Sequence, residues 1–136
     1  MEIDKAKDVR KAYDMAIQAF SKKLNDDNAD EIELYLEKIE DYKESYNYNN
    51  IESKKGLGLT ILFGLLLIAT GFDIGTREYQ ETIQSVVGYL ATGTFSLMGL
   101  YTIVKGFSFF QNDRIKNQKF AEETIVEIAD DYKRIK

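Results

Sequence analysis

The chain of 136 residues contains no cysteine, no histidine, no proline and no tryptophan. Without cysteine and histidine it can form no disulfide, and it lacks thiolate and imidazole nucleophiles, bases and ligands for the usual zinc and haem sites. The absence of proline suits a chain that is helical along most of its length, because proline interrupts helices. The serine and tyrosine hydroxyls have no imidazole to activate them, so we expect no catalytic residue and no enzyme activity.

Binding motifs for small molecules and nucleic acids are also missing. The sequence has no phosphate-binding loop, dinucleotide fingerprint or nucleophile elbow, so we expect no cofactor. Its many carboxylates lack the glycine-containing loop spacing of an EF-hand, which favours solvated helix faces over a metal site. The net charge of -5 argues against nucleic acid as a partner. The charged start, MEIDKAKDVRKAYDM, has no apolar core of a signal peptide.

Two long stretches without charge dominate the sequence, Gly56 to Phe72 and Ile83 to Val104, although 30% of all residues are charged. At about 1.5 Å per helical residue, each is close to the length that crosses a hydrocarbon core of about 30 Å. The sequence therefore predicts an all-α membrane protein, in which a two-span transmembrane helical hairpin is flanked by cytoplasmic amphipathic helices. The alternative, a soluble bundle around two apolar core helices, leaves too few and too polar helices to cover them.

The hairpin occupies residues 51–110 in this interpretation, with spans at about 56–74 and 83–104, and its direction follows from the distribution of lysine and arginine. Six of them flank the spans on the terminal side: Lys54, Lys55, Lys105, Arg114, Lys116 and Lys119. The turn from Asp73 to Thr82 holds Arg77 against three acidic residues. The positive-inside rule then predicts cytoplasmic N- and C-termini.

The flanking segments have apolar residues at helical spacing. One amphipathic helix is expected from Ile3 to Leu24, ended by the run Asn25 to Asn28, where Asn28 and Glu31 have the spacing of a helix N-cap. A second follows up to a hinge at Asn47 to Asn50, so that residues 1–50 form a cytoplasmic helical hairpin. Residues 111–136 form a cytoplasmic C-terminal helix. Their narrow apolar stripes favour a small bundle, completed in part by neighbouring subunits or a cytoplasmic protein partner.

Small residues recur within both spans and are the candidate site for helix packing. They lie three or four residues apart: Gly56, Thr60 and Gly64 in the first span, and Gly88, Thr92, Ser96 and Gly99 in the second. Such stripes let helices approach closely. The second span has more small and hydroxyl residues than one partner helix needs, which favours a homo-oligomer in the lipid bilayer. Thr92, Ser96 and Gly99 are then the candidate pore-lining residues.

The order of these elements, Ile3–Tyr46, Gly56–Phe72, Ile83–Val104 and Ala121–Ile135, resembles the SLATT-type two-transmembrane domains of bacterial conflict systems. The resemblance implies a bacterial inner-membrane effector that oligomerises and permeabilises the membrane when a partner signals. A calcium uniporter-like channel has a similar order. However, Asp73-Ile74 is not followed by the proline of the selectivity loop of such channels, and tryptophan is absent. Both absences argue against a calcium channel.

Three functions are considered at this point, and the sequence favours the first of them. The first is a homo-oligomeric pore or membrane-perturbing effector, in which no buried charge is needed. The second is a non-conducting membrane scaffold or adaptor subunit whose cytoplasmic helices bind a partner protein. The third, a wedge that shapes membranes, is disfavoured because the flanking helices are acidic or neutral rather than basic. A pump or carrier is disfavoured because neither span contains an ionisable residue.

Overall fold

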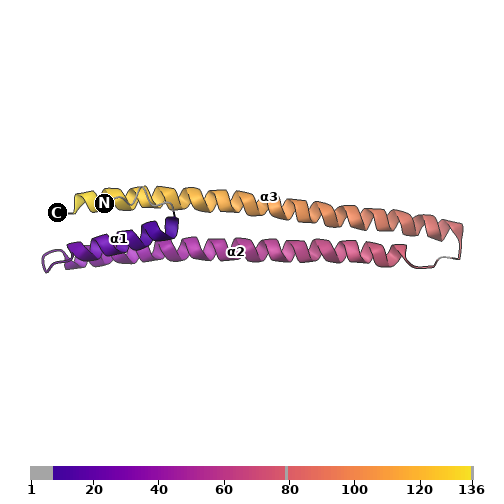
Figure 1. The fold of residues 1–136 in the computed structure, drawn as a ribbon, viewed down its shortest axis with the longest axis horizontal. Helices are drawn as coiled ribbons and strands as arrows, with labels where there is room; N and C mark the ends of the chain where they lie inside the picture. The colour runs from indigo at the N-terminus through magenta and orange to yellow at the C-terminus, as the bar shows by residue number, and fades with distance from the viewer. Residues whose placement is uncertain (1–7, 79, 136) are drawn as a thin grey trace. The chain divides into compact units, whose positions relative to one another are not determined.

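The computed structural model describes residues 8–78 and 80–135, which form three α-helices and no strand (Figure 1). They are α1 (Val9–Lys23), α2 (Ala29–Gly75) and α3 (Thr82–Arg134). The predicted all-α class is confirmed for these residues. The part of the first predicted helix that precedes residue 8 lies outside the described residues.

Local side-chain hydrogen bonds define where α1 begins and where it ends. The Asp8 carboxylate caps α1 by accepting a hydrogen bond from the Arg10 backbone N–H at 3.0 Å. After Lys23, the Asn28 side chain accepts from the Asn25 N–H at 2.8 Å and donates to the Lys23 carbonyl at 2.9 Å. The helix break predicted at Asn25 to Asn28 is therefore confirmed. The Asn28 carbonyl accepts from the Ile32 N–H of α2 at 3.0 Å, whereas its side chain bonds back along the turn.

The hinge predicted at Asn47 to Asn50 is wrong, because α2, which is 47 residues long, continues through these residues without a break. Asparagine breaks a helix when its side chain bonds to the nearby backbone. Here the side chains of Asn49 and Asn50 bond instead to Asn117 of α3. The Asn117 amide nitrogen donates to Asn50 Oδ1 at 2.8 Å, and its side-chain oxygen accepts from Asn49 at 3.5 Å. Likewise, the predicted C-terminal helix is not separate, since it is the end of the 53-residue α3.

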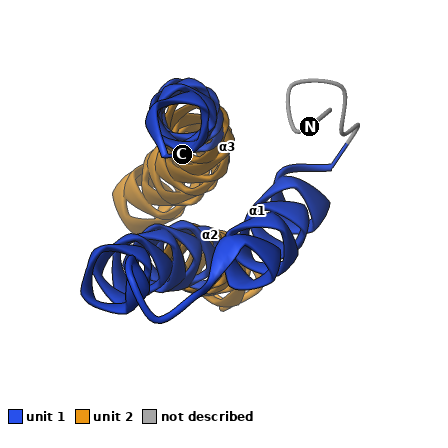
Figure 2. Cartoon of the chain, turned by 90° about the vertical axis from the view of Figure 1, so that its left-hand side faces the viewer, with its two compact units in different colours: residues 1–51, 114–136 blue, residues 52–113 orange. Residues whose placement is uncertain are grey.

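The chain divides into two compact units, coloured separately in Figure 2. Unit 1 contains residues 1–51 and 114–136, and unit 2 contains residues 52–113. Unit 1 therefore joins the two segments that flank the apolar stretches, and it holds α1 together with the first part of α2 and the last part of α3.

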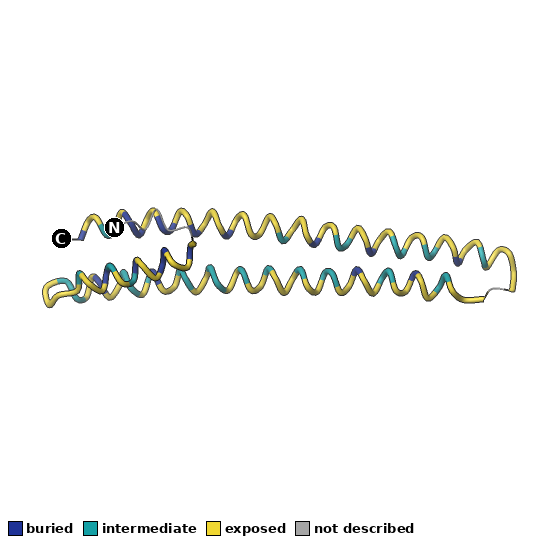
Figure 3. Tube along the Cα trace, viewed as in Figure 1, coloured by how far each residue is buried: buried dark blue, intermediate teal, exposed yellow. Residues whose placement is uncertain are grey.

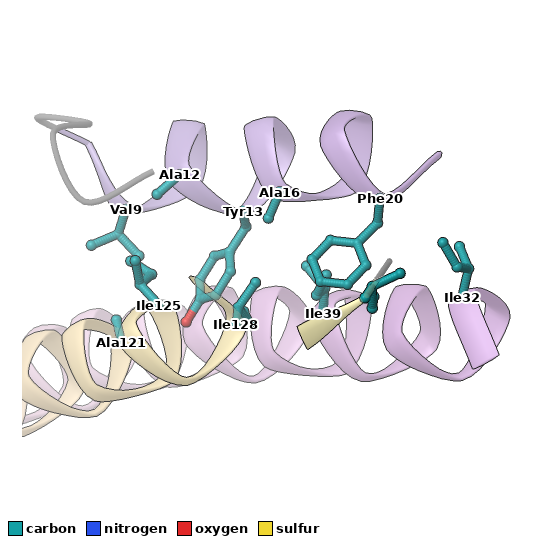
Figure 4. Close-up of a cluster of buried hydrophobic side chains, with 11 residues drawn as sticks. Val9, Ala12, Tyr13, Ala16, Phe20, Ile32, Ile39, Ala121, Ile125 and Ile128 are labelled. Carbon is teal, nitrogen blue, oxygen red and sulfur yellow. The ribbon is translucent and has the colours of Figure 1, made fainter. Parts of the chain in front are cut away.

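The core of unit 1 is built from large side chains. Tyr13 and Phe20 of α1 point toward α2 and α3, and both are fully buried (Figure 4). The Phe20 ring packs against Tyr35 of α2 at 5.5 Å and against Tyr132 of α3 at 5.3 Å between centroids. Fully burying a side chain of this size contributes about 1.5–3 kcal/mol, so these contacts hold α1 on the other two helices.

Unit 2 contains the apolar parts of α2 and α3, which run antiparallel in a hairpin joined by residues 76–81 (Figure 1). By length and composition, both helices are long and apolar enough to cross a membrane. Only 11% of the most apolar 18-residue window of each helix is buried inside the structure, whereas a core helix of a soluble protein is mostly buried. Figure 3 shows these windows as mainly exposed, with isolated buried positions.

Candidate functional site: a glycine seam between the apolar helices

The contact between the two helices of unit 2 is made by glycine. Every buried residue among the described residues of this unit is a glycine: Gly64, Gly71, Gly88, Gly99 and Gly106. We call these five residues the glycine seam. Because glycine has no side chain, backbone lies against backbone where Gly64 and Gly99 meet, and side chains such as Ile103 and Thr60 pack onto the glycines of the facing helix.

The distances across the glycine seam leave no room for a methyl group. A Cβ added to Gly99 would lie 2.5 Å from the Gly64 carbonyl oxygen, and one added to Gly64 would lie 2.8 Å from the Gly99 carbonyl oxygen. A Cβ on Gly71 would lie 3.0 Å from the Thr92 carbonyl oxygen. Since real Cβ atoms essentially never approach within 3.0 Å, substitution of Gly64 or Gly99 must push the helices apart.

Four members of the glycine seam form pairs with a spacing of seven residues, one pair on each helix. Gly64 and Gly71 are seven apart on α2, and Gly99 and Gly106 are seven apart on α3. A seven-residue repeat keeps one face of each helix against its partner and is typical of a left-handed supercoil. The stripes predicted from three- and four-residue spacing include Gly64, Gly88 and Gly99 but not Gly71 and Gly106. The seven-residue repeat was the signal that could have found them.

The structure brings most of the predicted packing residues together inside the hairpin. Thr60 faces Gly106, since a Cβ added to Gly106 would lie 2.5 Å from the methyl carbon of Thr60. Thr92 lies against Gly75, and the Ser96 hydroxyl would be 3.2 Å from a Cβ on Gly71. Gly56 lies elsewhere: it is exposed, and an added Cβ would meet no atom within 4 Å.

The three candidate pore-lining residues Thr92, Ser96 and Gly99 therefore lie on the side of α3 that faces α2. The Thr92 hydroxyl donates to the Gly88 carbonyl of its own helix at 2.9 Å. Thr94 and Thr102 form the same kind of bond with the carbonyls four residues earlier, both at 2.8 Å. Such bonds satisfy a hydroxyl without water or a second subunit.

The outer surface of unit 2 is apolar. Its large side chains are exposed in both helices: Leu59, Leu62, Phe63, Leu65, Leu66 and Phe72 on α2, and Ile83, Val86, Val87, Tyr89, Leu90, Leu97, Met98, Leu100, Tyr101, Val104, Phe107 and Phe109 on α3. Soluble monomers rarely expose a contiguous apolar patch larger than a few hundred Å². This surface therefore requires a covering of lipid or of other apolar chains.

Charged residues of unit 2 lie only at the two ends of the hairpin. Lys54, Lys55 and Lys105 lie at the end near the termini, and Lys105 is 5.7 Å from the Tyr101 ring centre. At the other end, the Arg77 guanidinium pairs with the Asp73 carboxylate at 2.8 Å. The described part of the unit thus has a long uncharged middle between two charged ends.

Unit 1 has a polar network on its surface. The Lys38 ammonium of α2 pairs with Glu127 and, at 3.1 Å, with Asp131 of α3, while the Tyr42 hydroxyl donates to Glu127 at 3.2 Å. The hydrogen bond from Lys38 lowers the pKa of Glu127, and the same bond raises the pKa of Lys38. Burial raises the pKa of Tyr42. All three shifts stabilise the charge states present at neutral pH, as in a structural network.

No family model, curated protein or solved structure matches the chain. The likeness to SLATT-type domains thus depends on the order of the elements alone.

Proposed function

We propose that this chain is a membrane scaffold or adaptor subunit: a non-conducting transmembrane hairpin, residues 52–113, that holds a cytoplasmic domain of amphipathic helices at a bacterial inner membrane. One observation carries the proposal. The hairpin packs Thr60, Thr92, Ser96 and four buried glycines between its own helices and exposes large apolar side chains, while the exposed hydroxyls of Thr70 and Thr94 bond to carbonyls of their own helices. This arrangement suits lipid outside and leaves no polar wall to line a pore.

Lipid is the covering that best fits the outer surface. Each apolar Å² removed from water contributes about 25 cal/mol, so the exposed leucine, phenylalanine and valine side chains favour transfer of the hairpin into a bilayer. In lipid, helices gain nothing hydrophobically by meeting each other, and close backbone packing of small residues holds them together. Unit 2, with glycine between its helices and large side chains on its outer surface, has the packing expected of helices in lipid.

Cytoplasmic termini are favoured by the charges at the hairpin ends. Lys54, Lys55 and Lys105 lie at the end that connects to unit 1, whereas Asp73, Arg77, Glu78 and Glu81 lie near the turn. The excess of lysine directs the terminal end to the cytoplasm. Because the chain has no native cysteine, single cysteines at Ser21 and at Thr76 can be labelled separately. In intact cells, Thr76→Cys should react with an impermeant maleimide and Ser21→Cys should not.

A homo-oligomeric pore or membrane-perturbing effector is the second candidate. Besides the resemblance, it is favoured by Gly58 and Gly93, which are exposed and where an added Cβ would meet no atom within 4 Å. Another helix could approach closely at either position. Such a contact would join hairpins through their outer faces.

Reconstitution separates the two candidates. The purified chain is placed in liposomes that contain a self-quenched dye and an ion reporter, and the mass of the purified particle is measured in parallel. The scaffold proposal predicts a small particle and no release of dye or ions. A ring of several copies that releases either one would overturn it in favour of the pore.

A further inference from the structure

The outward face of the first part of α2 has no partner within unit 1. On the side away from Ile32 and Ile39 of the core, positions three and four residues apart form an exposed stripe: Asp30, Leu34, Glu37, Asp41, Glu44 and Tyr48. We call this stripe the outer stripe. Its two apolar members stand out, because Leu34 is 68% exposed and Tyr48 is 64% exposed. A coiled-coil contact has this spacing.

The outer stripe lies in a strongly acidic region whose basic residues face elsewhere. Residues 26–44 contain two lysines and nine carboxylates: Asp26, Asp27, Asp30, Glu31, Glu33, Glu37, Glu40, Asp41 and Glu44. Lys43 pairs with Asp14 of α1 at 2.6 Å, and Lys38 pairs with Glu127 and Asp131 of α3. None of the nine carboxylates forms an ion pair within the described part of the chain.

These charges contribute nothing to the core of unit 1. Asp30 and Glu31 lie in the first turn of α2, where negative charge favours the helix. The carboxylates further along α2 have no such role, and like charges at neighbouring positions of a helix face weaken the helix slightly. A surface of this sign is also repelled by an anionic membrane. A cationic protein surface with matching apolar residues complements both the carboxylates and the two exposed apolar side chains.

We propose that the outer stripe binds a basic amphipathic helix of a partner protein. The partner would place apolar side chains on Leu34 and Tyr48 and lysine or arginine against Glu37, Asp41 and Glu44. Leu34 and Tyr48 are fourteen residues apart, or about 21 Å along the helix, so a partner helix of about four turns covers both. The proposal rests on the adaptor function and names the chemistry of the partner.

Two isomeric peptides test the proposal on the full chain in nanodiscs of neutral lipid. The first is a helix of alanine, glutamine and lysine with two leucines fourteen residues apart on one face. The second has the same composition, but one leucine is moved to the opposite face. Calorimetry, with empty nanodiscs as the blank, should show that the first peptide binds about tenfold more tightly and that its affinity falls with added salt.

Variants of the chain locate the binding surface. Leu34→Ala and Tyr48→Ala remove no charge, and each should weaken the first peptide about tenfold. Glu37→Gln with Asp41→Asn should weaken binding and reduce its salt dependence. As the matched control, Glu123→Gln with Val126→Ala, both at exposed positions of α3, should leave binding unchanged.

Two results would overturn the proposal. Equal affinities for both peptides, or affinities insensitive to Leu34→Ala and Tyr48→Ala, would show only diffuse attraction between charges. A change in particle mass caused by Leu34→Ala would identify the outer stripe as a contact between copies of this chain. Alkaline extraction of the same membranes tests the anchor independently, since loss of the chain from the membrane would contradict the proposed function but not the binding.

Discussion

The two units of this chain pack the same two helices in opposite ways. In unit 1, large residues such as Phe20, Ile39 and Ile128 are buried and most charged residues are exposed. In unit 2, glycine is buried, and large residues such as Phe63 and Leu97 are exposed. Water drives the first arrangement, because burial of large apolar groups is favourable there. The second is stable where the surroundings are as apolar as the side chains. The contrast is what the proposed location of unit 2 in lipid predicts.

The largest expected effect comes from a bulky residue in the glycine seam. Gly99→Leu should separate the helices of unit 2 and cost about 3 kcal/mol or more, because its Cβ would collide with the Gly64 carbonyl. Thermal unfolding in nanodiscs, followed by circular dichroism, measures the change. Gly93→Leu is the matched control on the same helix, since Gly93 is exposed. Similar losses in both variants would contradict the seam.

A matched pair of phenylalanines compares the two units directly. Phe20→Ala should destabilise unit 1 by about 3–5 kcal/mol, because it removes a fully buried ring. Phe63→Ala, at a residue that is 58% exposed, should change the stability of unit 2 in lipid by less than about 1 kcal/mol. Denaturant unfolding in nanodiscs gives both values. Equal losses of stability in the two variants would contradict the proposal that unit 1 folds in water and unit 2 in lipid.

The amide cluster of unit 1 should have an intermediate effect. Asn117 is buried and donates to the Tyr46 carbonyl at 3.2 Å and to Asn50 at 2.8 Å. Asn117→Ala should cost about 1–3 kcal/mol, since it removes two hydrogen bonds to half-buried groups of α2. A double-mutant cycle with Asn50→Ala measures how much of this loss is shared. Strictly additive losses would show that the two amides act independently.

The smallest expected effect is a dependence on pH at Glu127. Its pKa is lowered in the fold by the hydrogen bond from Lys38, so its contribution is complete above its usual pKa of 4.5 and is lost as the pH falls through the lowered value. Because the Glu127 side chain is 49% exposed, the contribution should be under about 1 kcal/mol. Glu127→Gln should flatten the dependence of unit 1 stability on pH in this acidic range, measured by urea unfolding.

How much the sequence predicted depended on the range of the interactions. The helical class and the break at Asn25 to Asn28 follow from composition and local turns, and both were found. The hinge at Asn47 to Asn50 was wrong because bonds to Asn117, far along the chain, outweigh the local preference of asparagine.

Within the candidate site, the residue type was predictable but the repeat was not. Gly64, Gly88 and Gly99 were identified, yet Gly71 and Gly106 were missed, because their seven-residue spacing is present in the sequence but gains meaning only when two helices are placed together. Gly56 has the right spacing from Gly64 but does not face α3. Which small residues of a helix face its neighbour depends on how the two helices pack, and the sequence of one helix alone does not reveal this.

The glycine seam also bears on how the protein is made. Glycine inside a helix costs about 1 kcal/mol relative to alanine in water, so the five glycines together disfavour helix formation there by about 5 kcal/mol. In a bilayer, unpaired backbone groups cost several kcal/mol each, which outweighs that preference. On the proposed location, these segments become stable helices as they leave water. Release of the finished chain into the cytoplasm would expose weak, apolar helices to aggregation, so synthesis is expected to proceed at the membrane.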